Sequence, residues 1–223
     1  MIQNTLHKFW WIFLPVVLLL IQIGIEILLD DPTRESFLKE GGSHENFQAA
    51  IMAVACIMAT ILILRVQNIW LKIWFGIASL ASLYVAGEEL SWGQWLFHWQ
   101  TPAEWELLND QGETNLHNTS SWLDQKPKAL LQIGVLVGGI ILPLLKLLKP
   151  SALPERFTLI YGDYHLLPTA FIALGMKLAE TAQDHLGFHF FWRISEVLEL
   201  YMFYFVALYL YYMMKRFPAQ PRE

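Results

Sequence analysis

The sequence predicts an all-α membrane protein: a polytopic bundle of about six transmembrane helices with a long, partly helical outer loop, forming one domain over residues 1–223. Composition is the first observation behind this prediction. Hydrophobic residues make up 55% of the chain, aromatic residues 14% and charged residues only 16%, whereas a soluble domain carries about 25% charged residues. The second observation is a series of apolar stretches near the length of a membrane crossing. Together they exclude an ordinary soluble enzyme, a disordered chain and a disulfide scaffold.

The cysteine content excludes an intramolecular disulfide, and the charge distribution argues against a nucleic-acid partner. The single cysteine, Cys56, lies in an apolar run, so the chain cannot form an intramolecular disulfide. The net charge is -5 and the Lys and Arg residues are scattered along the chain. A nucleic-acid-binding protein gathers basic residues on one face. We therefore expect no nucleic-acid partner, and instead a membrane lipid and a lipid-like or small amphipathic substrate.

A transmembrane helix needs about 20 mostly apolar residues. Basic residues close several of the stretches that qualify: Arg65 ends the second, Lys146 follows the fourth and Lys215 stops the last. The fifth stretch is the least regular, because Pro168 and Lys177 lie inside it. The predicted spans are 9–29, 47–64, 69–86, 129–145, 161–182 and 194–214.

The Lys and Arg residues of the short loops predict the orientation. With six spans the two termini share a side, and cytoplasmic loops carry the excess of basic residues. We therefore expect both termini in the cytoplasm, in a bacterial inner (plasma) membrane, and the loops after the first, third and fifth spans outside. Nine basic residues lie on the side of the termini: Lys8, Arg65, Lys72, Lys146, Lys149, Arg156, Lys215, Arg216 and Arg222. Five lie on the other: Arg34, Lys39, Lys126, Lys128 and Arg193.

Carboxylates and imidazoles gather at the outer ends of the helices. For the acids of residues 30–45, a solvated loop is sufficient explanation. Glu26 and Lys177 lie only a few residues from the outer boundary, where long side chains reach the surface. Lys177 can also pair with Glu180 at i,i+3. For these two residues we favour a structural role over an intramembrane functional one.

The segment GEELSWGQWLFHW, residues 87–99, carries the densest set of polar groups. Glu88 and Glu89 diverge by about 100° on a helix, so they serve different partners. If the helix continues, Ser91, Gln94 and His98 share one face. This pattern predicts a helix lying in the membrane interface with its aromatic residues in lipid. An interfacial aromatic belt with incidental polar residues is the alternative. The aromatic positions are Trp92, Trp95, Phe97 and Trp99.

The long outer loop holds two further motifs. Residues 101–104 read as a capping box with Pro at the first helical position, so we expect a short helix over 102–108 in which Glu104 caps. In the following GETNLHN, Glu113 and His117 are spaced i,i+4, a spacing at which two side chains of a helix can bind one metal ion. Asn115 and Asn118 could orient imidazole rings or cap helix ends.

The end of the fifth span and the start of the sixth carry a third group of polar residues. Glu180 and Asp184 are spaced i,i+4. His185 and His189 form an HxxxH pair, which supplies two metal ligands if the helix persists through Gly187. In the last helix, the carboxylates of Glu196 and Glu199 share a face beside a long apolar run, where they are costly unless they meet a polar pocket or a cation. A structural role remains open for each pair.

The strings GEELSWGQ and GETNLHN, with the acidic start of the last span, resemble an uncharacterised family of small polytopic bacterial membrane proteins. This resemblance implies family membership and brings no reaction with it. The chain is also similar in kind to the CREST-type membrane hydrolases, which include alkaline ceramidases and use a Ser, a carboxylate and three His around zinc. Ser91, His98, His185 and His189 are the matching residue types. Their spacing and the helix count depart from that pattern, so the similarity is an analogy.

Our first hypothesis is a membrane-embedded, metal-dependent hydrolase or transferase acting on a lipid-like substrate at the outer leaflet. A divalent metal, with Zn²⁺ as the example, lowers the pKa of bound water toward about 7, and a carboxylate such as Glu89 then accepts the proton. Ser91 and Glu199 are the other catalytic candidates. The metal ligands would be His117, His185 and His189, with Glu88 or Glu196. The supporting residues would be His98, Gln94, Glu113, Asn115, Asn118, Glu180 and Asp184.

Two other functions remain open. The same residues could form a structural network in a non-enzymatic accessory or assembly protein. They could also line a proton or cation path, although the sequence has no inverted repeat of the kind common in transporters. The enzyme hypothesis requires the acids of the third helix, the long loop and the HxxxH pair to converge in one pocket.

Overall fold

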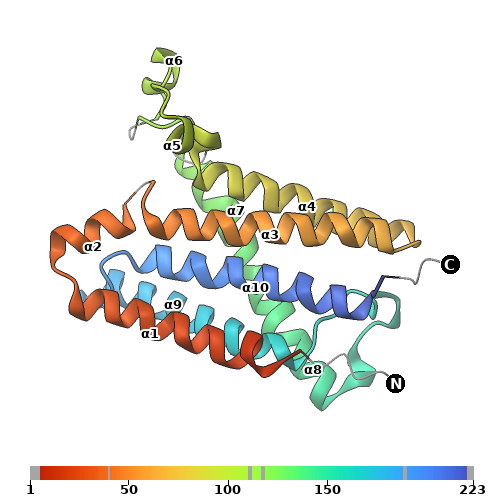
Figure 1. Cartoon of the computed structure of the whole chain (residues 1–223). Helices are drawn as coiled ribbons and strands as arrows, with labels where there is room; N and C mark the ends of the chain where they lie inside the picture. Colours follow the sequence, from red (N-terminus) through yellow and green to blue (C-terminus); the bar gives the residue numbers. More distant parts are fainter. Residues whose placement is uncertain (1–5, 40, 110–111, 117–118, 188–189, 220–223) are drawn as a thin grey trace.

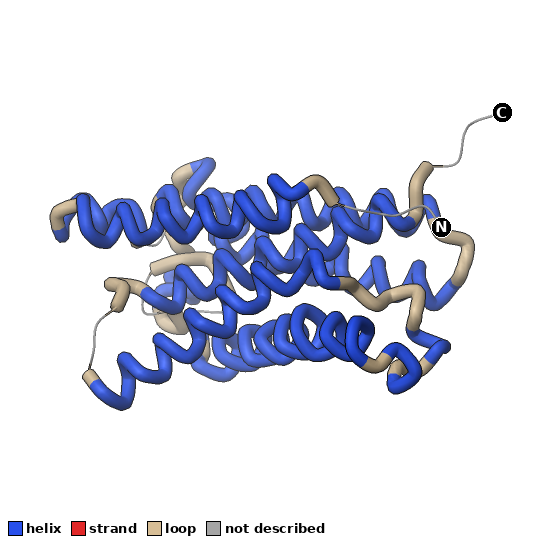
Figure 2. Tube along the Cα trace, turned by 90° about the horizontal axis from the view of Figure 1, so that it is seen from below, coloured by secondary structure: helices blue, strands red, loops and turns tan. Residues whose placement is uncertain are grey.

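The structure is a computed structural model that describes residues 6–39, 41–109, 112–116, 119–187 and 190–219. Within these ranges the chain consists of helices and loops, without strands (Figure 2). The first half contains η1 (Phe9–Phe13), α1 (Leu14–Leu28), α2 (Asp31–Leu38), α3 (Ser43–Arg65), α4 (Ile69–Glu89), η2 (Ser91–Gly93), α5 (Gln94–Phe97) and α6 (Ala103–Glu106). The second half contains α7 (Ser121–Val135), η4 (Leu136–Ile141), α8 (Leu142–Leu148), η5 (Pro150–Ala152), η6 (Glu155–Phe157), η7 (Tyr164–Leu166), α9 (Leu167–Leu186) and α10 (Ile194–Arg216).

Five helical segments among the described residues are long and apolar enough to cross a membrane: Phe9–Leu28, Asp31–Arg65, Ile69–Glu89, Gln125–Leu148 and Ile194–Arg216. Their length and composition are what an integral membrane protein requires. They overlap five of the six predicted spans, and the all-α prediction is confirmed for the described part of the chain.

The fifth predicted span, 161–182, differs from the structure at its start. Helix α9 begins at Leu167, because Pro168 occupies the first turn, where its missing N–H costs no hydrogen bond. The residues before it form the short 3-10 turn η7 instead. Helix α9 has 20 residues, enough to cross a membrane, but its second half carries Lys177, Glu180 and Asp184. It is therefore less apolar than the five segments above.

Helix α10 is the centre of the bundle. It packs against α3 and α9 and lies between α3 and α1 in Figure 1. In its most apolar window 67% of the residues are buried, against 33% or less for the other four apolar segments. A helix that is apolar on all sides is stable only when it is surrounded. The other helices turn apolar side chains outward, which is the surface that lipid would cover.

Tyrosines of α10 bind backbone carbonyls of the surrounding helices and loops. The Tyr201 hydroxyl donates to the carbonyl of Pro15 at 2.8 Å, and the Tyr209 hydroxyl donates to that of Ile160 at 2.9 Å. The hydroxyl of Tyr209 also accepts from the indole N–H of Trp74 at 2.9 Å. A buried tyrosine hydroxyl such as that of Tyr201 needs a partner of this kind. These bonds fix the central helix against three other parts of the chain.

The first described residues, before η1, and the last ones, after α10, lie at the same end of the bundle, as Figure 1 shows. The opposite end holds α2, the start of α3, the end of α4 and the loop into α10. The segment with α5 and α6 projects sideways from this end, beyond the end of α4. The fold therefore brings the acidic residues at the end of α1, the end of α4 and the start of α10 to this end, but it does not place the projecting segment over the middle of the bundle.

The helix from α7 to α8 contains a π-helical turn, η4, with two adjacent glycines. A Cβ atom at Gly139 would lie 2.5 Å from the ring of Phe205 and 2.6 Å from the Cβ of Ala170, whereas one at Gly138 would meet only the Phe205 ring at 3.8 Å. Gly139 therefore allows η4 to approach α9 and α10 closely, and Gly138 serves as its matched control.

We predict that Gly139→Ala destabilises the protein by about 1–3 kcal/mol through overpacking. Gly138→Ala should be neutral or slightly stabilising, because alanine favours the helix and meets no close atom. Thermal unfolding of the two variants in detergent, followed by circular dichroism, measures the difference. Equal melting temperatures would show that η4 does not pack against α9 and α10 as described.

Candidate functional site

Helix α4 ends where the most polar motif begins. Ser91 and Trp92 adopt positive φ angles of 45° and 54°, and Gly93 follows with a φ of 104°. The prediction of one continuous helix over 87–99 is therefore wrong: the chain turns sharply and resumes as the short helix α5. Left-handed φ at a residue other than glycine costs about 1–3 kcal/mol. The turn must be held by contacts from elsewhere in the chain.

Those contacts come from the second motif. The Ser91 hydroxyl donates to Glu113 Oε2 at 3.0 Å, and the side-chain amide of Asn115 donates to the same carboxylate. Asn109 Nδ2 donates to Asn115 Oδ1 at 2.9 Å. These four side chains are each exposed by 2% or less. We call the whole set the polar knot; its members are Glu88, Ser91, Gln94, Asn109, Glu113, Thr114 and Asn115.

Gln94 connects the two motifs in a second way. Its Oε1 accepts from the Thr114 N–H at 2.8 Å, and its Nε2 donates to the Thr101 hydroxyl at 2.8 Å. The Thr101 hydroxyl donates to the carbonyl of Gly112. The capping-box prediction is therefore wrong, because Pro102 is the N-cap residue of α6 and no side chain caps this helix. Glu104 is exposed.

Glu88 completes the knot from the last turn of α4. Its carboxylate accepts from the indole N–H of Trp92 at 2.6 Å and from the N–H of Leu116 at 2.7 Å. A Cβ atom at Gly87 would lie 2.9 Å from the Trp92 ring, so the position suits glycine. Glu88 is buried, and the adjacent Glu89 is only half-buried.

Several candidate residues are not part of the knot. His98 is exposed at the end of α5, where its φ of 55° ends the helix. Residues 113–116 are not helical, so the expectation that Glu113 presents a ligand from one helical face is wrong. His117, Asn118 and His189 lie outside the described residues.

The candidates on α9 and α10 form separate pairs. Lys177 Nζ lies 2.7 Å from Glu180 Oε2, which confirms the predicted i,i+3 pair. His185 is exposed, with Nδ1 2.8 Å from the carbonyl of Thr181 in its own helix, and Asp184 is exposed beside it. Glu199 pairs with Lys128 of α7. The backbone carbonyl of the half-buried Glu196 accepts from Gln48 of α3 at 2.9 Å.

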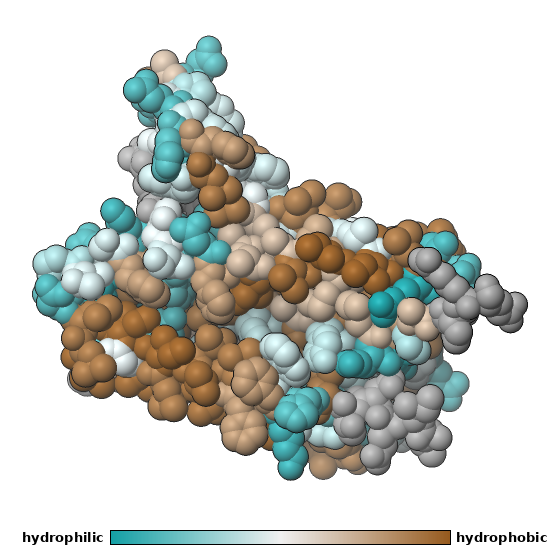
Figure 3. Space-filling view, viewed as in Figure 1, coloured by the Kyte–Doolittle hydropathy of each residue, from teal (hydrophilic) through white to brown (hydrophobic). Residues whose placement is uncertain are grey.

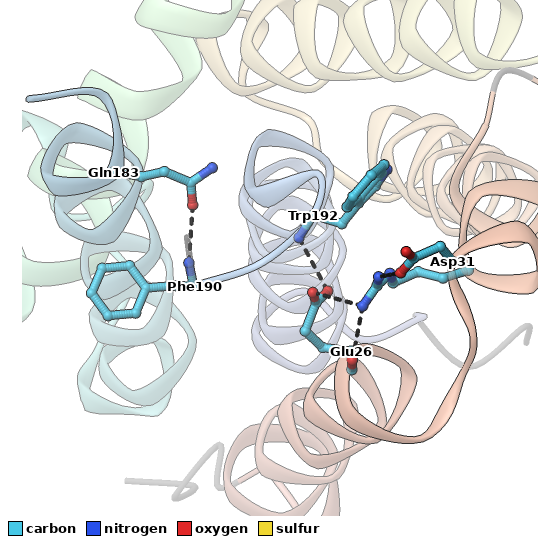
Figure 4. A network of polar contacts seen from close by, with 6 residues as sticks. Glu26, Asp31, Gln183, Phe190 and Trp192 are labelled. Carbon is cyan, nitrogen blue, oxygen red and sulfur yellow. Dashed lines mark hydrogen bonds and ion pairs between the residues drawn. The ribbon is translucent and has the colours of Figure 1, made fainter. Parts of the chain in front are cut away.

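Figure 4 shows a third group, centred on Glu26. Arg34 Nη1 donates to Glu26 Oε1 at 3.0 Å and to the Glu26 carbonyl at 2.9 Å, and Arg34 also pairs with Asp31. The Trp192 N–H donates to the other carboxylate oxygen of Glu26 at 3.1 Å, and its ring lies 5.1 Å from the guanidinium. This group joins α1, α2 and the entry to α10, which agrees with the structural role expected for Glu26.

One polar pair at the opposite end was not anticipated. His165 is buried; its Nδ1 lies 2.6 Å from Asp163 Oδ1, and its Nε2 accepts from the Leu6 N–H at 3.3 Å. The short spacing of Asp163 and His165 was the available signal in the sequence. The pair fixes the chain before η1 against η7.

Comparison of the chain with protein families, curated proteins and solved structures gives no match. Among the residues that the structure describes, no group of three or more His, Cys, Asp and Glu side chains is arranged to hold a metal ion. Because His117 and His189 lie outside those residues, shared metal coordination stays a prediction.

We predict that Glu113→Gln destabilises the projecting segment, because the hydrogen bonds from Ser91 and Asn115 then lose their charged acceptor. Hydrogen bonds to a charged group are worth about 1.5–3 kcal/mol, so limited proteolysis within 87–116 should accelerate at least tenfold. Glu104→Gln is the matched control, because Glu104 is exposed. Equal cleavage rates of the two variants would contradict a holding role for Glu113.

Proposed function

We propose that the chain is a non-enzymatic accessory protein of the inner membrane, with six spans and both termini cytoplasmic. In this proposal, the two motifs build a rigid platform at the outer membrane interface for another membrane protein. We call residues 91–109 and 112–116 the interfacial platform. Nine basic residues on the side of the termini against five on the other support the orientation.

The observation that carries the proposal is the contrast in burial between the polar and the apolar side chains of the two motifs. Most of the polar side chains that the structure describes in these motifs are buried and bind one another in the polar knot, whereas most of the apolar side chains are exposed. An active site requires the reverse arrangement, with reactive groups facing a concave pocket. The exposed apolar residues of the platform are Trp92, Trp95, Leu96, Phe97, Trp99, Leu107, Leu108 and Leu116.

This apolar surface has two parts. Tryptophans near the end of α4 suit the membrane interface, where aromatic rings are enriched. Leu107 and Leu108 lie just beyond α6, the part of the platform farthest from the bundle in Figure 1, and Leu107 is 88% exposed. Figure 3 shows apolar atoms on the projecting segment together with polar ones toward its tip. A contiguous exposed apolar surface rimmed by polar residues marks sites of protein or membrane interaction.

The charge of the interfacial platform predicts the charge of its partner. Residues 90–116 contain no Lys or Arg, and Glu104 and Glu106 are exposed directly before the two leucines. Complementary charge guides association and selects partners. The partner surface should therefore be apolar at its centre and basic at its edge.

A photocrosslinking amino acid in place of Leu107 tests the proposal in native membranes. We expect a discrete protein adduct that the same probe at Leu80, an exposed position of α4, does not give. The double charge reversal Glu104→Lys with Glu106→Lys should reduce the adduct at least fivefold. Adducts that are identical at the two probe positions, or unaffected by charge reversal, would overturn the proposal.

The metal-dependent enzyme with a lipid-like substrate is the second candidate. Its supporting observation is the positive φ of the buried Ser91, whose hydroxyl bonds to Glu113, because backbone strain gathers at functional sites. Metal analysis after detergent purification separates the candidates. One equivalent of bound Zn²⁺ that is lost in His185→Ala would favour the enzyme, whereas metal-free protein with an intact platform would favour the accessory role.

A further inference from the structure

A groove lies between α7–η4, α9 and α10, away from the polar knot. Its volume is about 280 Å³. Ala170 and Ala173 of α9 and Met202 of α10 line its buried wall. Ile133 and Leu136, which also line it, are 59% and 40% exposed, so the groove opens on the outer side of the bundle. In a membrane, this opening faces lipid.

The helix arrangement explains why the groove exists. Helix α9 packs against η4, whereas α7 packs against α10. Gly139 in η4 allows the close approach at the inner half, and the lining residues farther out include the small Ala129 and Ala173. The space is near the lower end of the roughly 300–1,000 Å³ typical of ligand pockets. It suits a single hydrocarbon chain.

The outer end of the groove is polar and carries balanced charge. Lys177 lines the groove and bonds to Glu180 at 2.7 Å. The second pair, Lys128 and Glu199, is adjacent in sequence to the lining residues Ala129 and Leu198. The ammonium group of Lys177, with the carboxylate that it binds, therefore lies at the end of the apolar slot where a lipid headgroup would lie, and the second pair joins neighbouring turns of α7 and α10.

We propose that this groove binds one acyl chain of a phospholipid with a primary-amine headgroup, phosphatidylethanolamine being the example. The headgroup phosphate lies by Lys177 and its ammonium donates to the carboxylate of Glu180, the partner of Lys177. Balanced charge disfavours a purely anionic lipid, and carboxylate acceptors favour an ammonium with N–H donors over a quaternary amine. This inference rests on the proposed membrane location and is independent of the platform's partner.

Nanodiscs containing a phosphatidylethanolamine with a photoactivatable acyl chain provide the test. Mass spectrometry should map the label to residues 129–140 and 170–177. Ala129→Trp, which fills the groove from its exposed rim, should reduce this labelling at least fivefold. Ala81→Trp is the matched control, because Ala81 is an exposed alanine of α4, and it should label like the unmodified protein. Lys177→Ala should reduce labelling about threefold.

The possible results distinguish a failure of the groove proposal from a failure of the proposed membrane location. Label on α4 near Ile77 and Leu80 with none in the groove would overturn the groove while leaving the protein in the membrane. No label on any helix would overturn the membrane location itself. Unchanged labelling in Ala129→Trp would also overturn the groove, and equal labelling by the phosphatidylcholine analogue would overturn the headgroup assignment.

Discussion

Polar groups beside apolar helices must find partners within the chain, and the rest of this structure depends on that constraint. An unpaired polar group in an apolar environment costs several kcal/mol. At several positions the structure meets this requirement by connecting distant segments. Glu26 binds Arg34 and the backbone of Trp192, and Tyr201 binds the carbonyl of Pro15. Each such bond fixes the position of one helix against another.

The polar knot is the densest example of this constraint. Ser91 and Trp92 hold strained backbone angles, and the carboxylates of Glu88 and Glu113 bind the surrounding hydroxyl, amide and indole groups. Charge-assisted hydrogen bonds of this kind are about twice as strong as neutral ones, which offsets the strain. The result is a fixed turn that carries apolar side chains away from the bundle. The knot explains why both motifs are rich in polar residues without requiring that those residues react.

The positions of most long helices could be predicted from the sequence, because each coincides with an apolar stretch. Segment boundaries at Arg65, Ile69 and Lys215 agree with the helices to within a few residues. The site was harder to predict, because its pairs are far apart in the chain: Ser91 meets Glu113, and Gln94 meets Thr114. The spacing of the polar residues predicts helices through 87–99 and 113–117. The backbone of the described residues turns there instead. The left-handed turn at Ser91 and Trp92 has no local sequence signal beyond Gly93.

Our central claim is that the polar knot holds the interfacial platform by itself. Hydrogen–deuterium exchange of the protein in lipid nanodiscs tests this claim most directly, with one sample in chelator and one in added Zn²⁺. The account predicts slow exchange of the amides of Thr114 and Leu116, which donate to Gln94 and Glu88, at the same rate in both samples. Fast exchange in chelator, with protection only when Zn²⁺ is present, would contradict it and identify the knot as part of a metal site.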